Sequence, residues 1–266
     1  MDQIIVKDLE VFTAGGDGRI VRHLLTAKLD TDLRRVSTAG GAIQGVSPES
    51  VAQQFLNTFE QQAGQKPEAI LEKAAETVLL QNGDVRKVQL TLSRTIAGPG
   101  GSPYETAYMV TREWHTAYAA MSSNFGNMKN FVANGLKALS GNDLLRVLKN
   151  SRITHFDKSE KGECVNTVIE LETLLPADEL LQLLQVIEAS LGRNYAAGSA
   201  ECSLDLDLLL YDAEISADEH LLLPHPGLAK RAYVLKGMAE IAPYRYHPVL
   251  MKTMETLFKD AEKAEY

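Results

Sequence analysis

The stretch Ser203-Leu-Asp-Leu-Asp-Leu-Leu-Leu-Tyr211 places two acidic residues, Asp205 and Asp207, inside an otherwise apolar run. Successive side chains of a β-strand point to opposite faces, so both carboxylates leave the same face. Ionised carboxylates are costly to bury without a partner, and Mg²⁺, which is often held by one or two carboxylates plus phosphates, is a suitable one. The alternative is an edge strand whose acidic face contacts water. The pattern alone favours neither interpretation.

The composition is that of an ordinary globular protein. The 266 residues are 45% hydrophobic and 23% charged, enough for two modest domains. A net charge of -8 argues against generic binding to nucleic acid or to an anionic membrane, so we expect neither partner. Cys164 and Cys202 lack metal-ligand spacing and are interpreted as reduced thiols. With no signal-peptide pattern and no apolar run of about 18 residues, we expect a cytoplasmic protein.

The N-terminal portion of the chain predicts two strands, two helices and two further strands. Ser47 offers an N-cap and Pro48 a first helical residue for a helix that runs to residue 63. Pro67 opens a second helix, which ends near residue 82. Strands are expected at residues 3–12, 22–30, 85–95 and 104–113, and a loop at 38–45.

The C-terminal portion predicts the order βαββαβ, followed by two helices. An apolar stripe from Leu180 to Leu191, with Pro176 at its start, marks the clearest helix. The order is typical of a ferredoxin-like α+β domain. Strands are expected at residues 117–122, 147–156, 164–174 and 203–211, and helices at 126–139, 177–191, 227–241 and 248–261.

Motifs downstream of the acidic strand carry a family resemblance. They are Leu222-Leu-Pro-His-Pro-Gly-Leu-Ala-Lys-Arg-Ala-Tyr-Val-Leu235 and Ala239-Glu-Ile-Ala-Pro243. With the acidic strand they resemble the family of 6-hydroxymethyl-7,8-dihydropterin pyrophosphokinase, a folate-pathway enzyme, which has a DLDxxLY-type strand, a PHP-type turn, an RAFVL-like segment and an AEIAP-like ending in this order. Ala117–Asn124 and Val165–Thr173 resemble its opening and central strands, so the match covers roughly residues 115–250.

This resemblance implies an Mg²⁺-dependent kinase of folate biosynthesis. It would transfer diphosphate from ATP to 6-hydroxymethyl-7,8-dihydropterin and leave AMP. Two alternatives stay open. One is a degenerate paralogue that binds pterin or nucleotide without turnover, and the other is a diphosphokinase for a different heterocyclic alcohol.

The resemblance also implies roles for individual residues. Asp205 and Asp207 would hold two Mg²⁺ ions and, with Arg193, form the catalytic set. Asn166 would read the amide edge of the pterin, and Tyr233 would stack on its ring. The nucleotide-binding residues would be Gln185, Glu188, His225 and Arg231.

The chain departs from the family pattern around these residues. The segment Asn194–Ser203, which in the family usually carries several basic residues and a Trp, has no Arg, Lys or Trp here. The aromatic residue just before the pterin Asn is Cys164. The family's RTPPLG-like run reads Arg152-Ile-Thr-His-Phe-Asp157. The lack of Arg and Lys in Asn194–Ser203 favours the degenerate paralogue, whereas the presence of both Asp205 and Asp207 favours the active diphosphokinase.

The N-terminal portion resembles dihydroneopterin aldolase. Met1–Phe12, Val110–Glu113 and the order of elements carry this weaker likeness. It implies a tunnelling-fold domain, an antiparallel sheet with two helices, over residues 1–113, and it leaves 114–266 for the pyrophosphokinase-like domain. Aldolase and pyrophosphokinase catalyse consecutive steps and are found fused. Such aldolase domains join their sheets edge to edge, so we expect a homo-oligomer, a tetramer or octamer, formed through this domain.

The aldolase residues are only partly present. Glu72 matches the glutamate that anchors the pterin, and Arg94 stands where the family has a lysine. Arginine can stabilise charge but is a poor base, because it keeps its proton at ordinary pH. Pro48 occupies the position of a tyrosine, and a loop of the family is missing after Phe12.

We therefore predict little or no aldolase activity. The reason is that Arg94 and Pro48 replace the groups that would move protons. Measuring glycolaldehyde release from dihydroneopterin tests the prediction. Turnover at about 1 s⁻¹ or more, an ordinary enzymatic rate, would contradict it.

Overall fold

The computed structural model describes residues 2–15, 18–32, 46–158, 162–193 and 202–264. The chain divides into two compact units, Met1–Trp114 and His115–Tyr266, one residue after the expected boundary. Both units combine helices with antiparallel sheets, in agreement with a mixed α and β fold. The expected loop at 38–45 and residues 194–201 lie outside the described residues. Within the described ranges, each helix is too short or too polar to cross a bilayer.

The first unit is built on one antiparallel sheet. Its strand order is β1-β2-β3-β4, so each strand pairs with its neighbour in the chain. Gly100 and Gly101, both with φ of 83°, form the tight turn between the last two strands. The strands are β1 (Asp2–Ala14), β2 (Ile20–Thr31), β3 (Val85–Ala97) and β4 (Pro103–Glu113).

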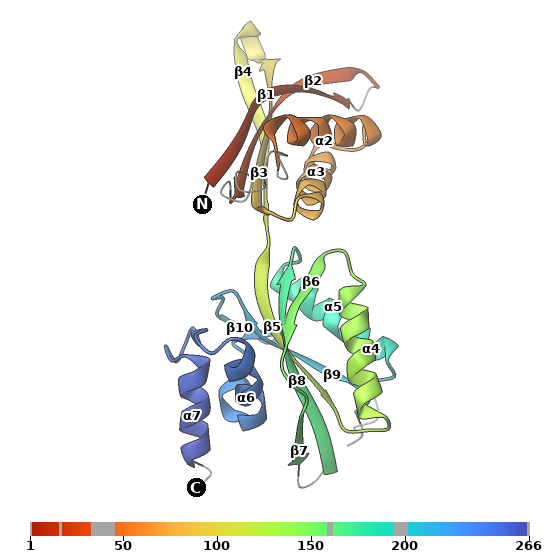
Figure 1. Ribbon diagram of the computed structural model, residues 1–266. Coiled ribbons are helices and arrows are strands. Elements are labelled where there is room, and N and C mark those ends of the chain that lie inside the picture. The colour runs from red at the N-terminus through yellow and green to blue at the C-terminus, as the bar shows by residue number, and fades with distance from the viewer. Residues whose placement is uncertain (1, 16–17, 33–45, 159–161, 194–201, 265–266) are drawn as a thin grey trace, which may run out of the picture. The chain divides into compact units, whose positions relative to one another are not determined.

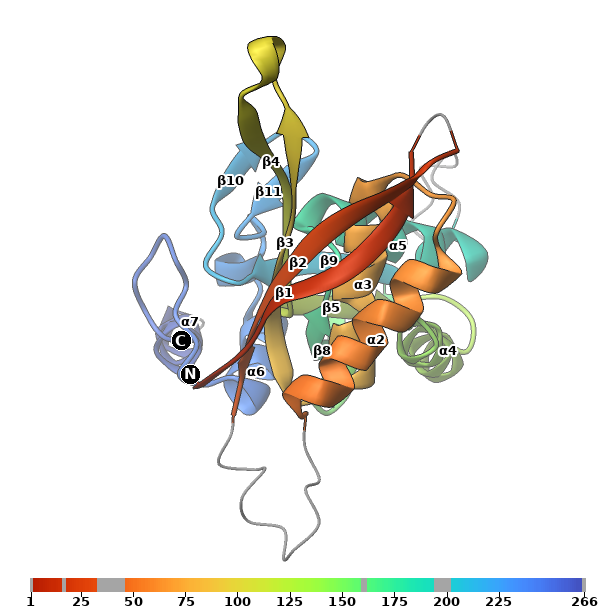
Figure 2. The ribbon, with the colours of Figure 1, turned by 90° about the horizontal axis from the view of Figure 1, so that it is seen from above.

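Helices α2 (Pro48–Gln61) and α3 (Pro67–Gln81) lie side by side on one face of this sheet (Figure 1; Figure 2). The start of α2 is the predicted cap, because the Ser47 hydroxyl accepts a hydrogen bond from the Ser50 backbone N–H at 3.1 Å. Fully buried apolar side chains fill the space between helices and sheet: Leu25, Leu29, Phe55, Ile70, Leu71, Leu79, Leu90 and Leu92.

The second unit has the predicted βαββαβ order, and its sheet order is β6-β8-β5-β9. All pairs are antiparallel, and β7 (Thr154–Lys158) adds to β8 alone among the described strands. The elements of the repeat are β5 (His115–Ser123), α4 (Met128–Ser140), β6 (Leu145–Asn150), β8 (Gly162–Thr173), α5 (Ala177–Ser190) and β9 (Asp205–Tyr211).

Helices cover both faces of this sheet (Figure 1). Helices α4 and α5 pack on one face, and α6 (Ala232–Ile241) with α7 (Met254–Ala264) on the other. Ala119 and Met121 of β5 belong to the α4–α5 core, whereas Tyr118 and Ala120 belong to the α6–α7 core. The central strand is therefore apolar on both faces, which explains why its sequence does not alternate.

The expected strand at 147–156 was wrong in extent, because the strand is interrupted at Ser151. The Ser151 backbone N–H donates to the Val168 carbonyl at 2.8 Å, and the Ser151 hydroxyl accepts from the Val168 N–H at 2.9 Å. A side-chain oxygen thus takes the place of a backbone carbonyl in the ladder. Strand β6 ends before this residue and β7 starts after it.

The C-terminal helices also differ from the expectation. The last helix begins at Met254 rather than at residue 248, because the His247 ring accepts hydrogen bonds from the backbone N–H groups of Val249 and Leu250 and holds a turn there. The helix expected at 227–241 consists of a short 3₁₀ turn and α6. The 3₁₀ turn is η2 (Leu228–Lys230). The sequence did not predict the hairpin formed by strands β10 (Ser216–Asp218) and β11 (Leu221–Leu223).

Candidate active site

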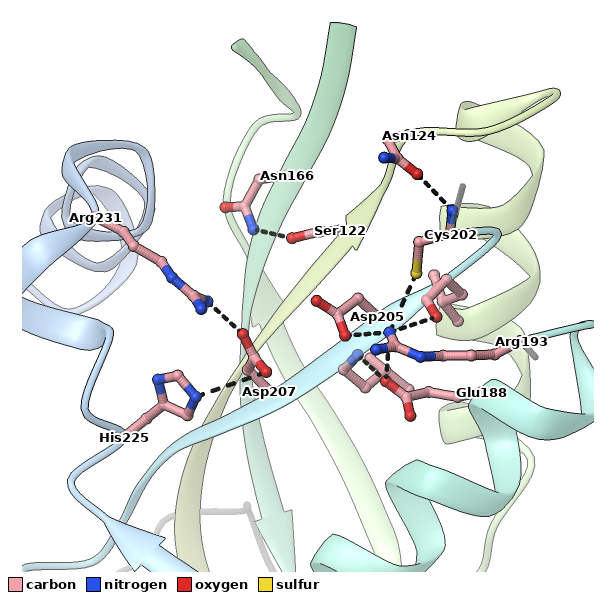
Figure 3. A network of polar contacts seen from close by, with 12 residues as sticks. Ser122, Asn124, Asn166, Glu188, Arg193, Cys202, Asp205, Asp207, His225 and Arg231 are labelled. Atoms are coloured by element: carbon pink, nitrogen blue, oxygen red, sulfur yellow. Dashed lines mark hydrogen bonds and ion pairs between the residues drawn. The ribbon is translucent and has the colours of Figure 1, made fainter. Parts of the chain in front are cut away.

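The acid pair lies on β9 with both side chains on the α6 side of the sheet. Asp205 pairs with Ser122 of β5, and Asp207 pairs with Ala120. Leu206 and Leu208 alternate with the acids and are buried in the α4–α5 core. The predicted single face for both carboxylates is therefore present, and Figure 3 shows them on the same side of the strand.

Arg193, which follows α5, is the partner of Asp205. Its Nη1 donates to Asp205 Oδ1 and also lies 3.2 Å from the Leu204 carbonyl and 3.4 Å from Glu188 Oε1. Burial by itself lowers the pKa of Arg193, but the charges of Asp205 and Glu188 outweigh it and raise that pKa overall. The guanidinium is thus a fixed positive charge beside the first acid (Figure 3).

Asp207 has its own arginine, which lies just before α6. Arg231 Nη1 donates to Asp207 Oδ2 at 2.5 Å, and His225 Nε2 lies 3.6 Å from Asp207 Oδ1. His225 Nδ1 accepts the Gly227 backbone N–H at 3.0 Å, so the proton of a neutral ring is on Nε2, which faces the acid. Burial lowers the pKa of His225, and the charge of Asp207 opposes this only in part. The ring is therefore a neutral donor at pH 7.

The Glu188 side chain, on α5, forms a hydrogen bond with the backbone of β9. This side chain is only 6% exposed, and its Oε1 accepts the Leu206 backbone N–H at 2.5 Å. The same oxygen faces Arg193 at 3.4 Å. This carboxylate therefore fixes the strand and the guanidinium, in addition to the nucleotide contact that the sequence predicts for it.

A cavity of about 630 Å³ opens beside the acid pair. This volume lies in the usual range for small-molecule sites, about 300–1,000 Å³. Both acids and their two arginines line it. Besides those four residues and Glu188, the cavity is lined by Leu181, Gln185, Leu221, Leu222, His225 and Lys230, among others.

The predicted pterin residues lie on the same side of the sheet as the acids, with Asn166 two strands away from Asp205. Asn166 of β8 is 1% exposed, and its Nδ2 donates to Ser122 Oγ at 3.0 Å (Figure 3). Tyr233 of α6 stacks on Phe156 of β7, with ring centroids 3.8 Å apart and planes 8° apart. The sequence reasoning missed Phe156, which only the cross-strand pairing of β7 with β8 places near Asn166.

The two residues predicted for the first unit have separate partners. Glu72 of α3 accepts a hydrogen bond from Arg112 of β4 at 2.5 Å. Burial, and after it the charge of Arg94, lowers the pKa of His23. Neither observation tests a pterin anchor, so that role stays a prediction.

The acid pair has the ligand chemistry that Mg²⁺ prefers. Within the described residues no group of three or more His, Cys, Asp and Glu side chains comes together, so a softer metal such as zinc has no ligand cluster there. Two carboxylates on one strand face, next to a cavity, match a hard cation that takes its other ligands from phosphate and water. Asp205 and Asp207 thus fit the ion that the sequence predicts.

Comparison with known proteins gives a family match for most of the second unit. The family described as 7,8-dihydro-6-hydroxymethylpterin-pyrophosphokinase (HPPK) matches residues 118–243. A 2-amino-4-hydroxy-6-hydroxymethyldihydropteridine pyrophosphokinase from Bacillus subtilis is 34% identical over 128 residues, which are 47% of this chain and 77% of the relative. The enzyme of the same name from Haemophilus influenzae is 35% identical over 130 residues, 48% of this chain and 81% of the relative.

The structural comparison also reaches the aldolase family. The crystal structure of E. coli dihydroneopterin aldolase in complex with neopterin covers 42% of this chain and 99% of its own, with 16% sequence identity and a TM-score of 0.37. A score this low carries no argument about the first unit.

Replacing Glu188 by Ala should destabilise the protein, because the buried Leu206 N–H loses its acceptor and Arg193 loses a counter-charge. We expect a loss of about 1–3 kcal/mol in the free energy of unfolding, measured by urea denaturation. Glu188→Gln keeps an acceptor oxygen and should lose less. Glu179→Ala, at an exposed position of the same helix, is the matched control and should change stability by no more than about 0.5 kcal/mol. Equal stability of the Glu188→Ala and Glu179→Ala variants would contradict the assignment.

Proposed function

Through residues 118–243 the chain belongs to the 7,8-dihydro-6-hydroxymethylpterin-pyrophosphokinase family, and we propose that these residues carry its activity at the acid pair of β9. The reaction is the transfer of diphosphate from ATP to 6-hydroxymethyl-7,8-dihydropterin in folate biosynthesis. The observation that carries the assignment of the site is the arrangement of Asp205 with Arg193 and of Asp207 with Arg231 at one wall of the cavity.

Charge balance explains how this wall can receive a triphosphate. Asp205, Asp207 and Glu188 are negative, while Arg193 and Arg231 are positive, so the acids alone would repel ATP. Mg²⁺ held by the two aspartates would neutralise the phosphates and polarise the transferred group. The arginines then stand beside the ion site, where a guanidinium can donate two hydrogen bonds to phosphate.

His225 and other residues that line the cavity would position the rest of the nucleotide. The neutral His225 ring presents its Nε2–H toward the acid pair and can donate it to a phosphate oxygen. Gln185, Leu181 and Leu222 also line the cavity, and their amide and apolar groups suit a flat base with polar edges. Phosphoryl transfer depends mainly on positioning and charge stabilisation, and these groups supply both.

The pterin would bind at Asn166 and Tyr233. The Asn166 amide is buried beside the Ser122 hydroxyl, so it offers an oxygen acceptor at a fixed position to the donors of a pterin edge. Ser122 pairs with Asn166 on one side and with Asp205 on the other, so pterin and acid sites are two strands apart on one sheet face. This spacing would bring the hydroxymethyl group toward the phosphates.

Release of AMP tests the activity. We expect the chain to form AMP from ATP only when 6-hydroxymethyl-7,8-dihydropterin and Mg²⁺ are present, and Asp205→Asn or Asp207→Asn to lower the rate by about 10²–10³ or more, as for other preorganised charge stabilisers. Calorimetry with a non-hydrolysable ATP analogue should show Mg²⁺-dependent binding that both variants lose. Asp178→Asn, on the exposed side of α5, is the control. Unchanged nucleotide binding in both β9 variants would refute the metal assignment.

We also propose that the first unit, a tunnelling-fold domain by its likeness to the aldolase, serves as an assembly platform. Strands β1 and β4 are the outer strands of its described sheet, and unpaired strand edges are templates for association. Ile5 and Phe12 of β1, and Tyr108 and Met109 of β4, are exposed apolar side chains on these strands. Closed rotational symmetry is the common way to pair such edges.

Light scattering tests this assembly. We expect the full chain to contain four or eight copies and a chain that starts at Thr116 to be smaller in copy number, because it lacks the four-stranded sheet. A monomeric full-length protein would contradict the platform, and so would a shortened chain that assembles in the same way.

A further inference from the structure

Lys230 is a cation of the candidate active site that has no role in the proposed function so far. It is the last residue of the 3₁₀ turn η2 and lines the same cavity as the acid pair. Its side chain is exposed, and among the described residues its ammonium group has no hydrogen-bond or ion-pair partner. One positive charge in the cavity is therefore available to a ligand.

The two arginines of the cavity are already paired. Arg193 Nη1 donates to Asp205 and also lies 3.1 Å from Cys202 Sγ, and Arg231 Nη1 donates to Asp207. A guanidinium that is held by a carboxylate must share that contact when a phosphate binds, whereas a free ammonium loses no ion pair. An ammonium without a partner is thus the cation that a phosphate can engage most directly.

The cavity has little positive charge for a triphosphate. Of the described residues that line it, four carry carboxylates and three carry cations. The segment after Arg193 adds no Arg or Lys up to Ser203. Charge stabilisation is the main requirement of phosphoryl transfer, so a third cation close to the phosphates has a large effect on the reaction.

The backbone of the turn fixes the position of Lys230. Its N–H and that of Arg231 both donate to the Gly227 carbonyl, at 3.2 and 3.1 Å. Leu228 at the start of the turn is fully buried in the α6–α7 core, which holds the turn in place. Lys230 is therefore fixed beside the arginine that contacts the second acid.

The order of residues along the chain places Lys230 between the two proposed substrates. His225, proposed for the nucleotide, precedes the turn, and Tyr233, proposed for the pterin, follows it in the first turn of α6. The phosphates that move from the nucleotide to the pterin must pass between these two positions. Lys230 thus comes from the part of the chain that borders the transferred group.

We infer that Lys230 is a catalytic residue that contacts the two phosphates that leave ATP. This inference rests on the proposed function, since it needs a triphosphate at the acid pair. Its ammonium group donates hydrogen bonds to the oxygens of the transferred diphosphate and stabilises the negative charge that spreads over them.

The bonds that change define what Lys230 stabilises. Because diphosphate moves and AMP remains, the bond that breaks joins the β-phosphorus to the oxygen that bridges to the α-phosphate. The hydroxymethyl oxygen of the pterin forms the new bond to that phosphorus. AMP keeps the electron pair of the broken bond, and the hydroxyl proton passes to water. Lys230 keeps its own protons throughout and acts by charge alone.

Replacing Lys230 by Met in the full chain removes the charge and keeps much of the side-chain length. We expect kcat/KM for AMP release to fall by about ten- to hundredfold, because a hydrogen bond to a charged group is lost. Lys230→Arg keeps the charge and should recover most of the rate. Lys236→Met is the matched control, since Lys236 is an exposed lysine of α6 and is not one of the residues that line the cavity.

Calorimetry separates a phosphate contact from a structural effect. With Mg²⁺ present, Lys230→Met should weaken the binding of a non-hydrolysable ATP analogue by about tenfold. The binding of AMP should stay unchanged, because AMP lacks the two phosphates in question. Equal weakening of both nucleotides would overturn the inference, and so would an unchanged affinity for the analogue. If the unchanged chain binds the analogue but releases no AMP, the proposed reaction fails, while the comparison of the two nucleotides still decides the lysine contact.

Discussion

The antiparallel register of β5 with its two neighbours is the constraint on which the active site depends. Ser122 of β5 pairs with Asp205 on one side and with Asn166 on the other, so this register sets the spacing between the acid pair and the proposed pterin residue. A slip of β9 by one residue would exchange the carboxylates with Leu206 and Leu208, which are buried in the α4–α5 core. Hydrophobic burial thus enforces the position of the charges.

Ion pairs between arginines and the two aspartates are the second feature on which the site depends. Arg193 and Arg231 come from the end of α5 and the start of α6, and each pairs with one aspartate. The segment after Arg193 has no further Arg or Lys up to Ser203, so these two guanidinium groups carry most of the positive charge at this wall. Paired acids tolerate partial burial that isolated ones would not.

The two units differ in how much of the expected sequence pattern they contain. The second unit keeps its acids and most of the motifs around them, and its family assignment follows from those residues. The first keeps a capped helix, an alternating sheet and open outer strands, whereas Arg94 and Pro48 stand where proton-transfer groups are expected. Alternation and capping are local requirements of folding, so they do not depend on such groups.

The sequence by itself determined the order of most of the longer helices and strands, the shared face of Asp205 and Asp207 and the family, because side-chain period, caps and motifs are local properties. Only the tertiary structure decided which groups meet. Arg231 lies 24 residues from its aspartate, and Phe156 reaches Tyr233 only through the pairing of β7 with β8. The interruption between β6 and β7 at Ser151 likewise depends on Val168 of a neighbouring strand. Such contacts depend on register and packing between distant segments, which no local pattern in a single sequence encodes.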